Sequence, residues 1–229
     1  MELPFSEACE RNKGPILEVL RKLFSKTESV LEIGSGTGQH AVHFSKHLPH
    51  LVWQPTELGE RVAMLKSRID LEGPGNLLPA KELDVLRNNW ELEKTDAVFI
   101  ANVFHIAPIE VMHSCLKVTS KCLKHLGIFC VYGPFRFGGE FTSPSNAQFD
   151  SSLKTNNPEW GIRDFEQLCQ VAEEEGLAFK HNYSMPVNNQ LLVFKKHFEP
   201  GILAWIQLKT DFRPSQKGNR PGGIINHDR

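Results

Sequence analysis

The stretch that most constrains the fold is residues 30–45, VLEIGSGTGQHAVHFS. It begins with a short apolar segment containing Glu32 and ends with apolar residues at helical spacing. Between them lies a turn of glycines and small polar residues: Gly34, Ser35, Gly36, Thr37 and Gly38. A strand, a glycine turn and a helix in this order allow an α/β sheet to bring backbone N–H groups and a positive helix end close to a ligand. The sequence therefore predicts an α/β protein with a ligand site at this turn.

The glycine spacing separates this turn from the common phosphate-binding motifs. It matches neither the G-x-G-x-x-G of NAD enzymes nor the G-x-x-x-x-G-K-[ST] of phosphate loops. Glu32 would add nothing to a pyrophosphate site, whereas an ammonium or hydroxyl group would gain from a carboxylate partner. The order acid-x-Gly-x-Gly-x-Gly resembles motif I of the class I S-adenosylmethionine (SAM) methyltransferases. The resemblance implies that Glu32 helps to bind the methionine end of the cofactor, and that the turn passes close beneath it through Gly34, Ser35, Gly36 and Gly38.

Two further acids end predicted strands. Glu57 closes the strand predicted over residues 51–57 and lies 19 positions after Gly38. Nucleotide-binding α/β folds place a carboxylate about 20 residues beyond the glycine motif, where it can accept hydrogen bonds from both ribose hydroxyls. Asp84 follows a third predicted strand, and the resemblance implies that Asp84 and Val85 contact the adenine. A helix cap or a solvated acid is the alternative for Asp84.

The fourth predicted strand, residues 95–102, is a continuous apolar run that ends at Asn102. Ligands bind just outside the carboxyl ends of parallel strands, so we expect Asn102 to contact the cofactor. His105 is the most plausible general base, since imidazole titrates near neutral pH; a structural hydrogen bond is the alternative. Asn12 lies in a polar segment before a predicted helix with Pro15 in its first turn. This segment is expected either to cover the cofactor, with Asn12 as a contact, or to be a solvated entry to the helix.

The second half of the chain completes the pattern of a Rossmann-like sheet. The predicted elements are a helix over 108–126, a strand over 128–132, a long loop over 136–150, a helix capped by Asp164, and a closing antiparallel pair over 177–183 and 190–196. We predict a class I SAM-dependent methyltransferase fold: α/β, with a mostly parallel seven-stranded sheet, an antiparallel last strand and helices on both faces. The domain is expected to cover residues 1–196, with 197–229 as an extended or disordered extension.

Seven segments, in order over residues 3–196, resemble the methyltransferase-like 26 family and its bacterial relatives. They are FSxACERNK, VLEIGSGTGQHAVHF, WQPTE, YGPF, SNAQFD, NPEWGIRD and MPVNNQLLVF. The resemblance implies a class I SAM-binding fold but brings no substrate with it. Residues of these segments are interpreted as a lid and an acceptor pocket; those assigned to the pocket are Tyr132, Phe135, Asn146, Asp150, Trp160, Arg163 and Asn189.

Composition argues against several other classes. A net charge of -1 over 229 residues provides no field that would favour nucleic acid or an anionic membrane. No apolar run approaches the ~20 residues of a membrane span. Five scattered cysteines without a CxxC pair suit a reducing compartment, so a cytoplasmic location is expected. His40, His43 and His47 share the helix after the glycine turn, and we predict that they lie on its exposed side and bind no metal.

These observations predict a SAM-dependent methyltransferase that acts on a small molecule, without nucleic-acid or membrane partners. S-adenosyl-L-methionine is the expected cofactor, and the oligomeric state is left open. The alternative from another class is a SAM-binding module that acts through a partner and does not turn over. An NAD(P)-dependent oxidoreductase is disfavoured by the glycine spacing and by Glu32.

Overall fold

The computed structural model describes residues 3–87 and 90–197. The chain from residue 198 onward, for which the sequence predicts an extended or disordered extension, lies outside the described residues.

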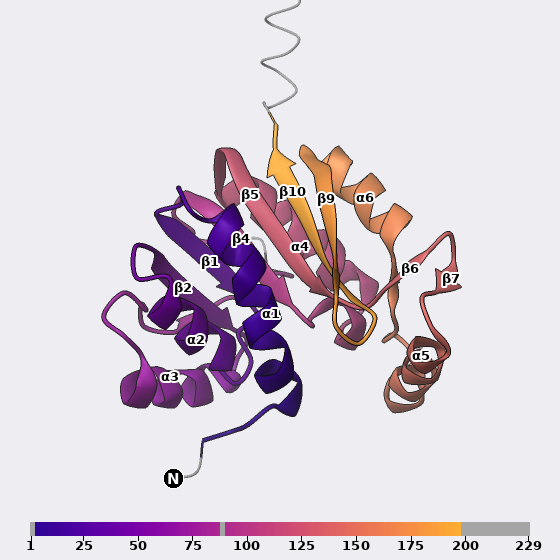
Figure 1. Ribbon diagram of the computed structural model, residues 1–229, viewed down its shortest axis with the longest axis horizontal. Coiled ribbons are helices and arrows are strands. Elements are labelled where there is room, and N and C mark those ends of the chain that lie inside the picture. Colours follow the sequence, from indigo (N-terminus) through magenta and orange to yellow (C-terminus); the bar gives the residue numbers. More distant parts are fainter. Residues whose placement is uncertain (1–2, 88–89, 198–229) are drawn as a thin grey trace, which may run out of the picture. The chain divides into compact units, whose positions relative to one another are not determined.

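A seven-stranded sheet with the order β3-β2-β1-β4-β5-β10-β9 forms the centre of the described chain (Figure 1). Its strands are β1 (Ser29–Ile33), β2 (Val52–Glu57), β3 (Lys81–Glu82), β4 (Thr95–Ala101), β5 (Leu123–Gly133), β9 (Leu177–Met185) and β10 (Asn189–Lys196). β10 pairs antiparallel with β5 and β9, while the other neighbours pair in parallel. The predicted fold, a mostly parallel sheet with an antiparallel final strand, is therefore confirmed.

Helices cover both faces of the sheet because its central strands are apolar on both sides. In β1, Val30 packs in a core with α1 and α2, whereas the next residue, Leu31, packs in a second core with α4 and α6. The alternation recurs in β4, where Phe99 faces the first core and Ile100 the second. The helices of the two faces, with α3 beside β2, are α1 (Glu7–Leu23), α2 (Gln39–His47), α3 (Arg61–Glu72), α4 (Ile109–Cys122) and α6 (Phe165–Glu174).

Residues 136–150, predicted as a loop, contain ordered elements instead. Strand β6 pairs antiparallel with β7 and in parallel with β8 to form a small second sheet, and helix α5 follows β7. The Ser143 hydroxyl accepts a hydrogen bond from the Asn146 N–H and Pro144 occupies the first turn, two features that start a helix. The bounds are η1 (Phe104–Ile106), β6 (Phe135–Phe137), β7 (Glu140–Phe141), α5 (Pro144–Asn156) and β8 (Arg163–Asp164).

The boundaries of two helices differ from the sequence-based prediction. Helix α1 begins at Glu7 with Ser6 as its N-cap, so Pro15 lies inside the helix and not in its first turn. Helix α4 ends four residues earlier than predicted, and β5 begins at the next residue, with Leu126 in a left-handed conformation at φ 60°. The Asp164 cap of α6 is confirmed, since its side chain accepts a hydrogen bond from the Glu166 N–H.

Candidate cofactor and acceptor site

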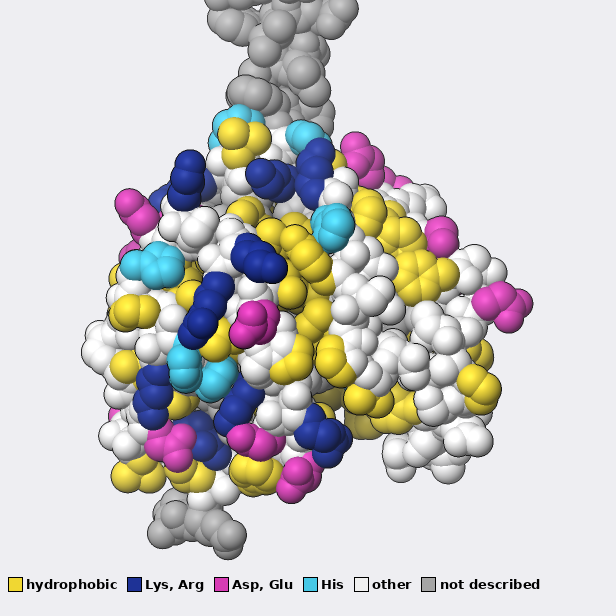
Figure 2. All heavy atoms as spheres, viewed as in Figure 1, with side chains coloured by type: hydrophobic (Ala, Val, Ile, Leu, Met, Phe, Trp, Pro, Cys, Tyr) yellow, Lys and Arg dark blue, Asp and Glu magenta, His cyan; other side chains and the backbone are white. Residues whose placement is uncertain are grey.

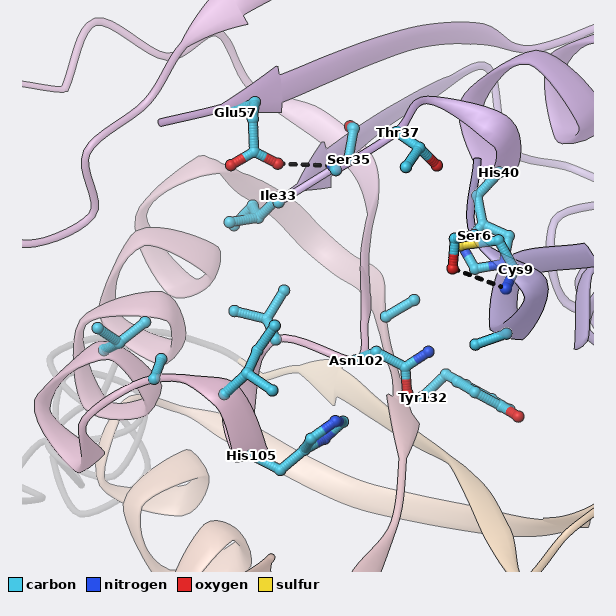
Figure 3. A pocket seen from close by; sticks show the side chains of 18 of the residues that line it. Ser6, Cys9, Ile33, Ser35, Thr37, His40, Glu57, Asn102, His105 and Tyr132 are labelled. Atoms are coloured by element: carbon cyan, nitrogen blue, oxygen red, sulfur yellow. Dashed lines mark hydrogen bonds between the residues drawn. The ribbon is translucent and has the colours of Figure 1, made fainter. Parts of the chain in front are cut away.

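A cavity of about 1100 Å³ opens at the carboxyl ends of the central strands. Its walls come from the glycine turn after β1, the ends of β2, β4 and β5, the start of α1, the η1 turn and the β9–β10 turn. Figure 3 shows Glu57 and Ser35 on one side of this space and Asn102, His105 and Tyr132 on the other. Pockets for one small ligand commonly measure roughly 300–1,000 Å³, and this cavity exceeds the upper end of that range. The predicted site residues that line the cavity are Asn12, Gly34, Ser35, Gly36, Glu57, Asp84, Val85, Asn102, His105, Tyr132 and Asn189.

The glycine turn forms one wall of this cavity with its backbone. Gly34 and Gly36 have φ values of 74° and 55°, in the left-handed region that favours glycine. A Cβ on Gly34 would lie 2.7 Å from Cγ2 of Val103, so the missing side chain lets β1 approach the segment after β4. A Cβ on Gly36 would meet nothing within 4 Å, which leaves room for a ligand against the backbone at this position.

Glu57 connects the glycine turn to the end of β2. Its Oε2 accepts a hydrogen bond from the Gly36 N–H at 2.6 Å, and its Oε1 accepts one from the Leu58 N–H at 3.0 Å (Figure 3). An ionised carboxylate has about four acceptor positions, so two further donors can bind to this buried side chain. The geometry suits a pair of vicinal hydroxyl groups lying beside the turn.

Asp84 lies next to an apolar part of the cavity. Its Oδ1 accepts from the Leu86 N–H at 3.0 Å, and its Oδ2 pairs with Arg87 Nε at 3.0 Å. The apolar side chains nearby come from the segments after β3 and β4; those that line the cavity include Val85, Leu86, Val103 and Ile106. An acid beside apolar walls suits a flat heteroaromatic ring that carries an amino group.

A chain of polar side chains joins α2, α1, β5 and the β9–β10 turn across one side of the cavity. Burial lowers the pKa of His40 to about 3, so its ring is neutral, and its Nε2–H donates to Asn12 Oδ1 at 2.6 Å. Burial raises the pKa of the Tyr132 hydroxyl, while its hydrogen bonds with the side chains of Asn12 and Asn189 act in the opposite direction. His40 is buried at the cavity, so the prediction that it lies on the exposed side of its helix is wrong.

His105 lies on the η1 turn at the opposite end of the cavity from Glu57 (Figure 3). Burial and, secondly, the positive charge of Arg163 lower the pKa of His105 to about 4, so the ring is neutral at physiological pH. Its Nδ1 and Asn102 Oδ1 both lie close to Gly133, where a Cβ would be 3.7 Å and 3.8 Å from them. Asn102 itself has φ 58°, a left-handed conformation that asparagine tolerates better than most residues.

Glu32 and Gly38, which the sequence assigns to cofactor binding, do not line the cavity. The buried Glu32 carboxylate accepts a hydrogen bond from Trp53 Nε1 at 2.9 Å. Burial raises the pKa of Glu32 to about 7, against the opposite effects of Trp53 and Ser35. Gly38 caps α2 at φ 77°, and a Cβ there would lie 2.8 Å from the Leu65 side chain, so this glycine serves the packing of α2 against α3.

Five of the residues assigned to the acceptor pocket also lie outside the cavity lining: Phe135, Asn146, Asp150, Trp160 and Arg163. Phe135 is buried in the core beneath the sheet. Arg163 holds the η1 turn from behind, because its Nε donates to the Phe104 carbonyl at 2.9 Å and its Nη2 donates to the Ala107 carbonyl. The guanidinium therefore fixes the backbone on either side of His105 and is not directed at an acceptor.

The other residues of this group hold the same wall. Asp150 Oδ1 accepts from the Ile162 N–H at 2.7 Å, and Asn146 Nδ2 donates to the Asn188 carbonyl at 3.3 Å. Helix α5 is thus tied both to the segment before β8 and to the β9–β10 turn. Half-buried Trp160 lies in that segment, where its N–H donates to the Asn157 carbonyl at 3.0 Å.

Several lining residues were not predicted as site residues. They are Cys9, Thr37, His40, Arg61, Ile106 and Val187. Thr37 and Cys9 lie inside the segments that carry the family resemblance, so a signal for them was present. Val187 also lies inside one of these segments, MPVNNQLLVF, although its place at a hairpin turn, which favours glycine or asparagine, gives no local reason to expect a valine there.

In the part of the chain that the structure describes, none of the helices is long and apolar enough to cross a membrane. No group of three or more His, Cys, Asp or Glu side chains is arranged there to hold a metal ion.

The arrangement of the sheet and helices is that of the class I methyltransferases. An O-methyltransferase family protein from Burkholderia thailandensis has a TM-score of 0.72 with 17% identity, covering 83% of this chain and 58% of that one. A structure described as PigF with SAH has a TM-score of 0.71 with 17% identity, covering 82% and 56%. Human N-acetylserotonin methyltransferase in complex with SAM has a TM-score of 0.65 with 14% identity, covering 86% and 61%. The chain thus spans somewhat more than half the length of these proteins.

The chain belongs to the family described as "Protein of unknown function (DUF938)", whose model matches residues 3–196. The match covers the whole described sheet and every residue named above as lining the cavity.

Proposed function

We propose that this protein is a SAM-dependent methyltransferase that acts on a small-molecule acceptor. The observation that carries the proposal is one continuous cavity with the glycine turn and Glu57 at one end and Asn102, His105 and Tyr132 at the other. The three proteins of the same fold support it, because they are an O-methyltransferase family protein, a protein with bound SAH and a methyltransferase with bound SAM. The seven segments, which occur in order over residues 3–196, support the closer relation to the methyltransferase-like 26 family.

The residues present fit a SAM molecule at the glycine-turn end. The open position at Gly36 would receive the ligand against the backbone, and the remaining acceptor positions of Glu57 would take the ribose hydroxyls. Asp84 and the apolar side chains beside it would hold the adenine. The Asn12 side chain is bonded to His40 through its oxygen and also to the Tyr132 hydroxyl, so one of its two amide N–H groups would remain for the methionine end.

When bound, SAM would supply a methyl group activated by a positively charged sulfur. The protein's own task is to hold an acceptor in line with that methyl group and to exclude water, because methyl transfer depends mainly on proximity and alignment. A protonated acceptor loses its proton as the new bond forms, and neutral His105 is the side chain we propose to receive it. With a pKa near 4 His105 is a weak base, which suits acceptors that need little deprotonation.

A SAM-binding module that does not turn over is the second candidate, and the weak basicity of His105 is the observation that favours it. Both candidates predict cofactor binding, and only the methyltransferase predicts conversion of SAM to S-adenosylhomocysteine. The free thiols of all five cysteines agree with a cytoplasmic location for either candidate.

The experiment that tests cofactor binding is calorimetric titration of the full chain with S-adenosylhomocysteine. We expect micromolar binding by the wild type and a loss of at least tenfold in Glu57→Ala, since charged hydrogen bonds contribute about 1.5–3 kcal/mol. Gly36→Val should lose binding as well, because its side chain would fill the space against the turn. Glu60→Ala, at the exposed start of α3, is the matched control. Absence of wild-type binding, with binding of NAD instead, would overturn the proposal.

A further inference from the structure

Three exposed apolar side chains from three separate elements line the same cavity. Ile106 belongs to η1, Phe149 to α5 and Val187 to the β9–β10 turn, and they are 41%, 42% and 73% exposed. Figure 2 shows hydrophobic side chains gathered on this face, around a hollow beside the end of the β9–β10 hairpin. Side chains that remain exposed while lining a cavity are available to a ligand, whereas the buried core residues are not.

Val187 occupies a position that the backbone makes unfavourable for it. Val187 and Asn188 have φ values of 58° and 56°, as in a type I′ hairpin turn, where asparagine and glycine are preferred. A β-branched residue in the left-handed region is a genuine outlier. Such conformations cluster at active sites and ligand-binding loops, where the surrounding structure holds them in place. The turn itself therefore gives no reason for valine, but a ligand contact at the cavity does.

The wall that carries these side chains is held in place before any ligand arrives. The Phe149 ring lies edge-on to the His105 ring, with centroids 5.4 Å apart. The bonds from Asn146 to the Asn188 carbonyl and from the Ile162 N–H to Asp150 connect α5 to both neighbouring loops. A preorganised apolar wall lowers the entropy cost of binding a rigid ligand.

Charge is concentrated at the other end of the cavity. Among the described residues that line it, the charged ones are Arg11, Glu57, Arg61 and Asp84. The last three come from the end of β2, the start of α3 and the segment after β3. Arg11 is exposed on α1 and lies 3.9 Å from the Glu7 carboxylate. The polar groups beside the apolar wall are uncharged amides, a hydroxyl and neutral His105. An ionised acceptor would lose its hydration there without gaining a buried protein side chain of opposite charge.

We infer that the acceptor is an uncharged small molecule with a flat apolar portion, bound against Phe149, Ile106 and Val187, with its nucleophilic atom directed towards Asn102 and His105. This inference rests on the proposed methyltransferase function and specifies its substrate class. Val187 acts as a specificity-determining contact at the mouth, and its side chain excludes water from the outer part of the acceptor. If an aromatic alcohol is the acceptor, an O–CH₃ bond would form as the S–CH₃ bond of SAM breaks, which leaves S-adenosylhomocysteine. The O–H bond of the acceptor would break in the same step, and its proton would pass to His105 and then to solvent.

The test uses three probes that share one ring system and differ in charge: 2-naphthol, 2-naphthoate and 2-(aminomethyl)naphthalene. Each is titrated calorimetrically into the full chain saturated with S-adenosylhomocysteine. We expect 2-naphthol to bind at least tenfold more tightly than either charged probe. Equal or tighter binding of 2-naphthoate would overturn the inference and would instead point to Arg11 as the partner of an anionic acceptor.

A pair of variants separates the role of Val187 from the relief of backbone strain. Val187→Asn removes the apolar contact, and Leu126→Asn makes the same replacement at another exposed left-handed residue, one that does not line the cavity. We expect Val187→Asn to weaken 2-naphthol binding at least fivefold and Leu126→Asn to leave it within twofold. S-adenosylhomocysteine binding should stay within twofold in both variants.

The outcomes distinguish a failure of the inference about the acceptor from a failure of the proposed function. If S-adenosylhomocysteine binds but 2-naphthol does not, or if Val187→Asn leaves its binding unchanged, the inference about the acceptor fails and the proposed function stands. If S-adenosylhomocysteine does not bind to the wild type, the proposed function fails first.

Discussion

The two ends of the cavity are built in different ways. At the glycine-turn end, residues close together in the sequence or at the ends of successive strands face the cavity themselves, as Gly36, Glu57 and Asp84 do. At the acceptor end, Tyr132 and Asn189 line the cavity, but other polar residues of the recognisable segments lie behind the wall, where Arg163 and Asp150 hold the backbone that carries other side chains. At this end the sequence motifs thus mark supports as well as direct contacts.

Under the proposed function, this difference follows from what each end would bind. A cofactor of fixed structure can be held by backbone N–H groups and carboxylates placed by a strand-turn-helix unit. An acceptor wall made of loops has no such local unit. Its loops need hydrogen bonds from distant residues to stay in one conformation, since buried backbone carbonyls must find donors.

The largest expected effect is a difference in stability between alanine variants of two glycines in the turn, Gly34 and Gly36. Gly34→Ala should destabilise the protein by about 3 kcal/mol, because a left-handed alanine costs about 1–2 kcal/mol and the clash with Val103 adds about 1–3 kcal/mol. Gly36→Ala should cost only about 1 kcal/mol, the conformational part alone. Urea unfolding of both variants measures the difference. Equal losses of stability in the two variants would contradict the interpretation that Gly34 is needed for packing and Gly36 for ligand binding.

The next effect concerns Glu32, the residue of the glycine-turn end that is buried away from the cavity. Its folded pKa of about 7 exceeds the ordinary value of 4.5, so the folded state binds this proton more tightly than the unfolded state. Its contribution to stability is therefore complete at low pH and is lost as the pH rises from about 4.5 through 7. The free energy of unfolding of the wild type, relative to Glu32→Gln, should fall by about 3 kcal/mol across that range.

The comparison of the wild type with Glu32→Gln removes the contribution of the histidines to the pH dependence of stability. The pKa values of His40, His43 and His105 lie at about 3, 4 and 4, below the ordinary 6.5, so they destabilise both proteins as the pH falls below 6.5. Because this effect is common to both, the difference between them reports Glu32 alone. A difference that does not change with pH would contradict the raised pKa.

Arg163→Met tests the support role of the acceptor end. Loss of the donors to the Phe104 and Ala107 carbonyls should reduce stability by about 2 kcal/mol. Removal of the positive charge should also raise the pKa of His105, measured by NMR titration, though not to its ordinary value, because burial is the larger cause of the shift. Arg21→Met, on the exposed side of α1, is the control and should change neither quantity. An unchanged pKa of His105 in Arg163→Met would contradict the proposed influence of Arg163 on the His105 side of the cavity.

The smallest effect is expected at the β9–β10 turn. Val187→Asn should stabilise the protein by about 1 kcal/mol, since asparagine adopts the left-handed conformation more easily than a β-branched residue. Leu126→Asn should also stabilise the protein, because Leu126 has a left-handed conformation as well. Thermal unfolding compares the two. Destabilisation by Val187→Asn would show that valine serves the fold at this turn and not a ligand.

The sequence by itself determined the sheet, its parallel core and antiparallel end, and the glycine turn that lines the cavity. These features depend on local patterns: apolar runs of strand length, glycines at a strand end, and acids at or just after a strand end, as Glu57 lies at the end of β2 and Asp84 two residues after β3. Only the tertiary structure decided which way individual side chains face. Glu32 turns to Trp53, His40 is buried against Asn12, and Arg163 reaches across 56 positions to the Ala107 carbonyl. Such contacts join residues far apart in the chain, and neither periodicity nor spacing carries information about a partner that folding alone brings near.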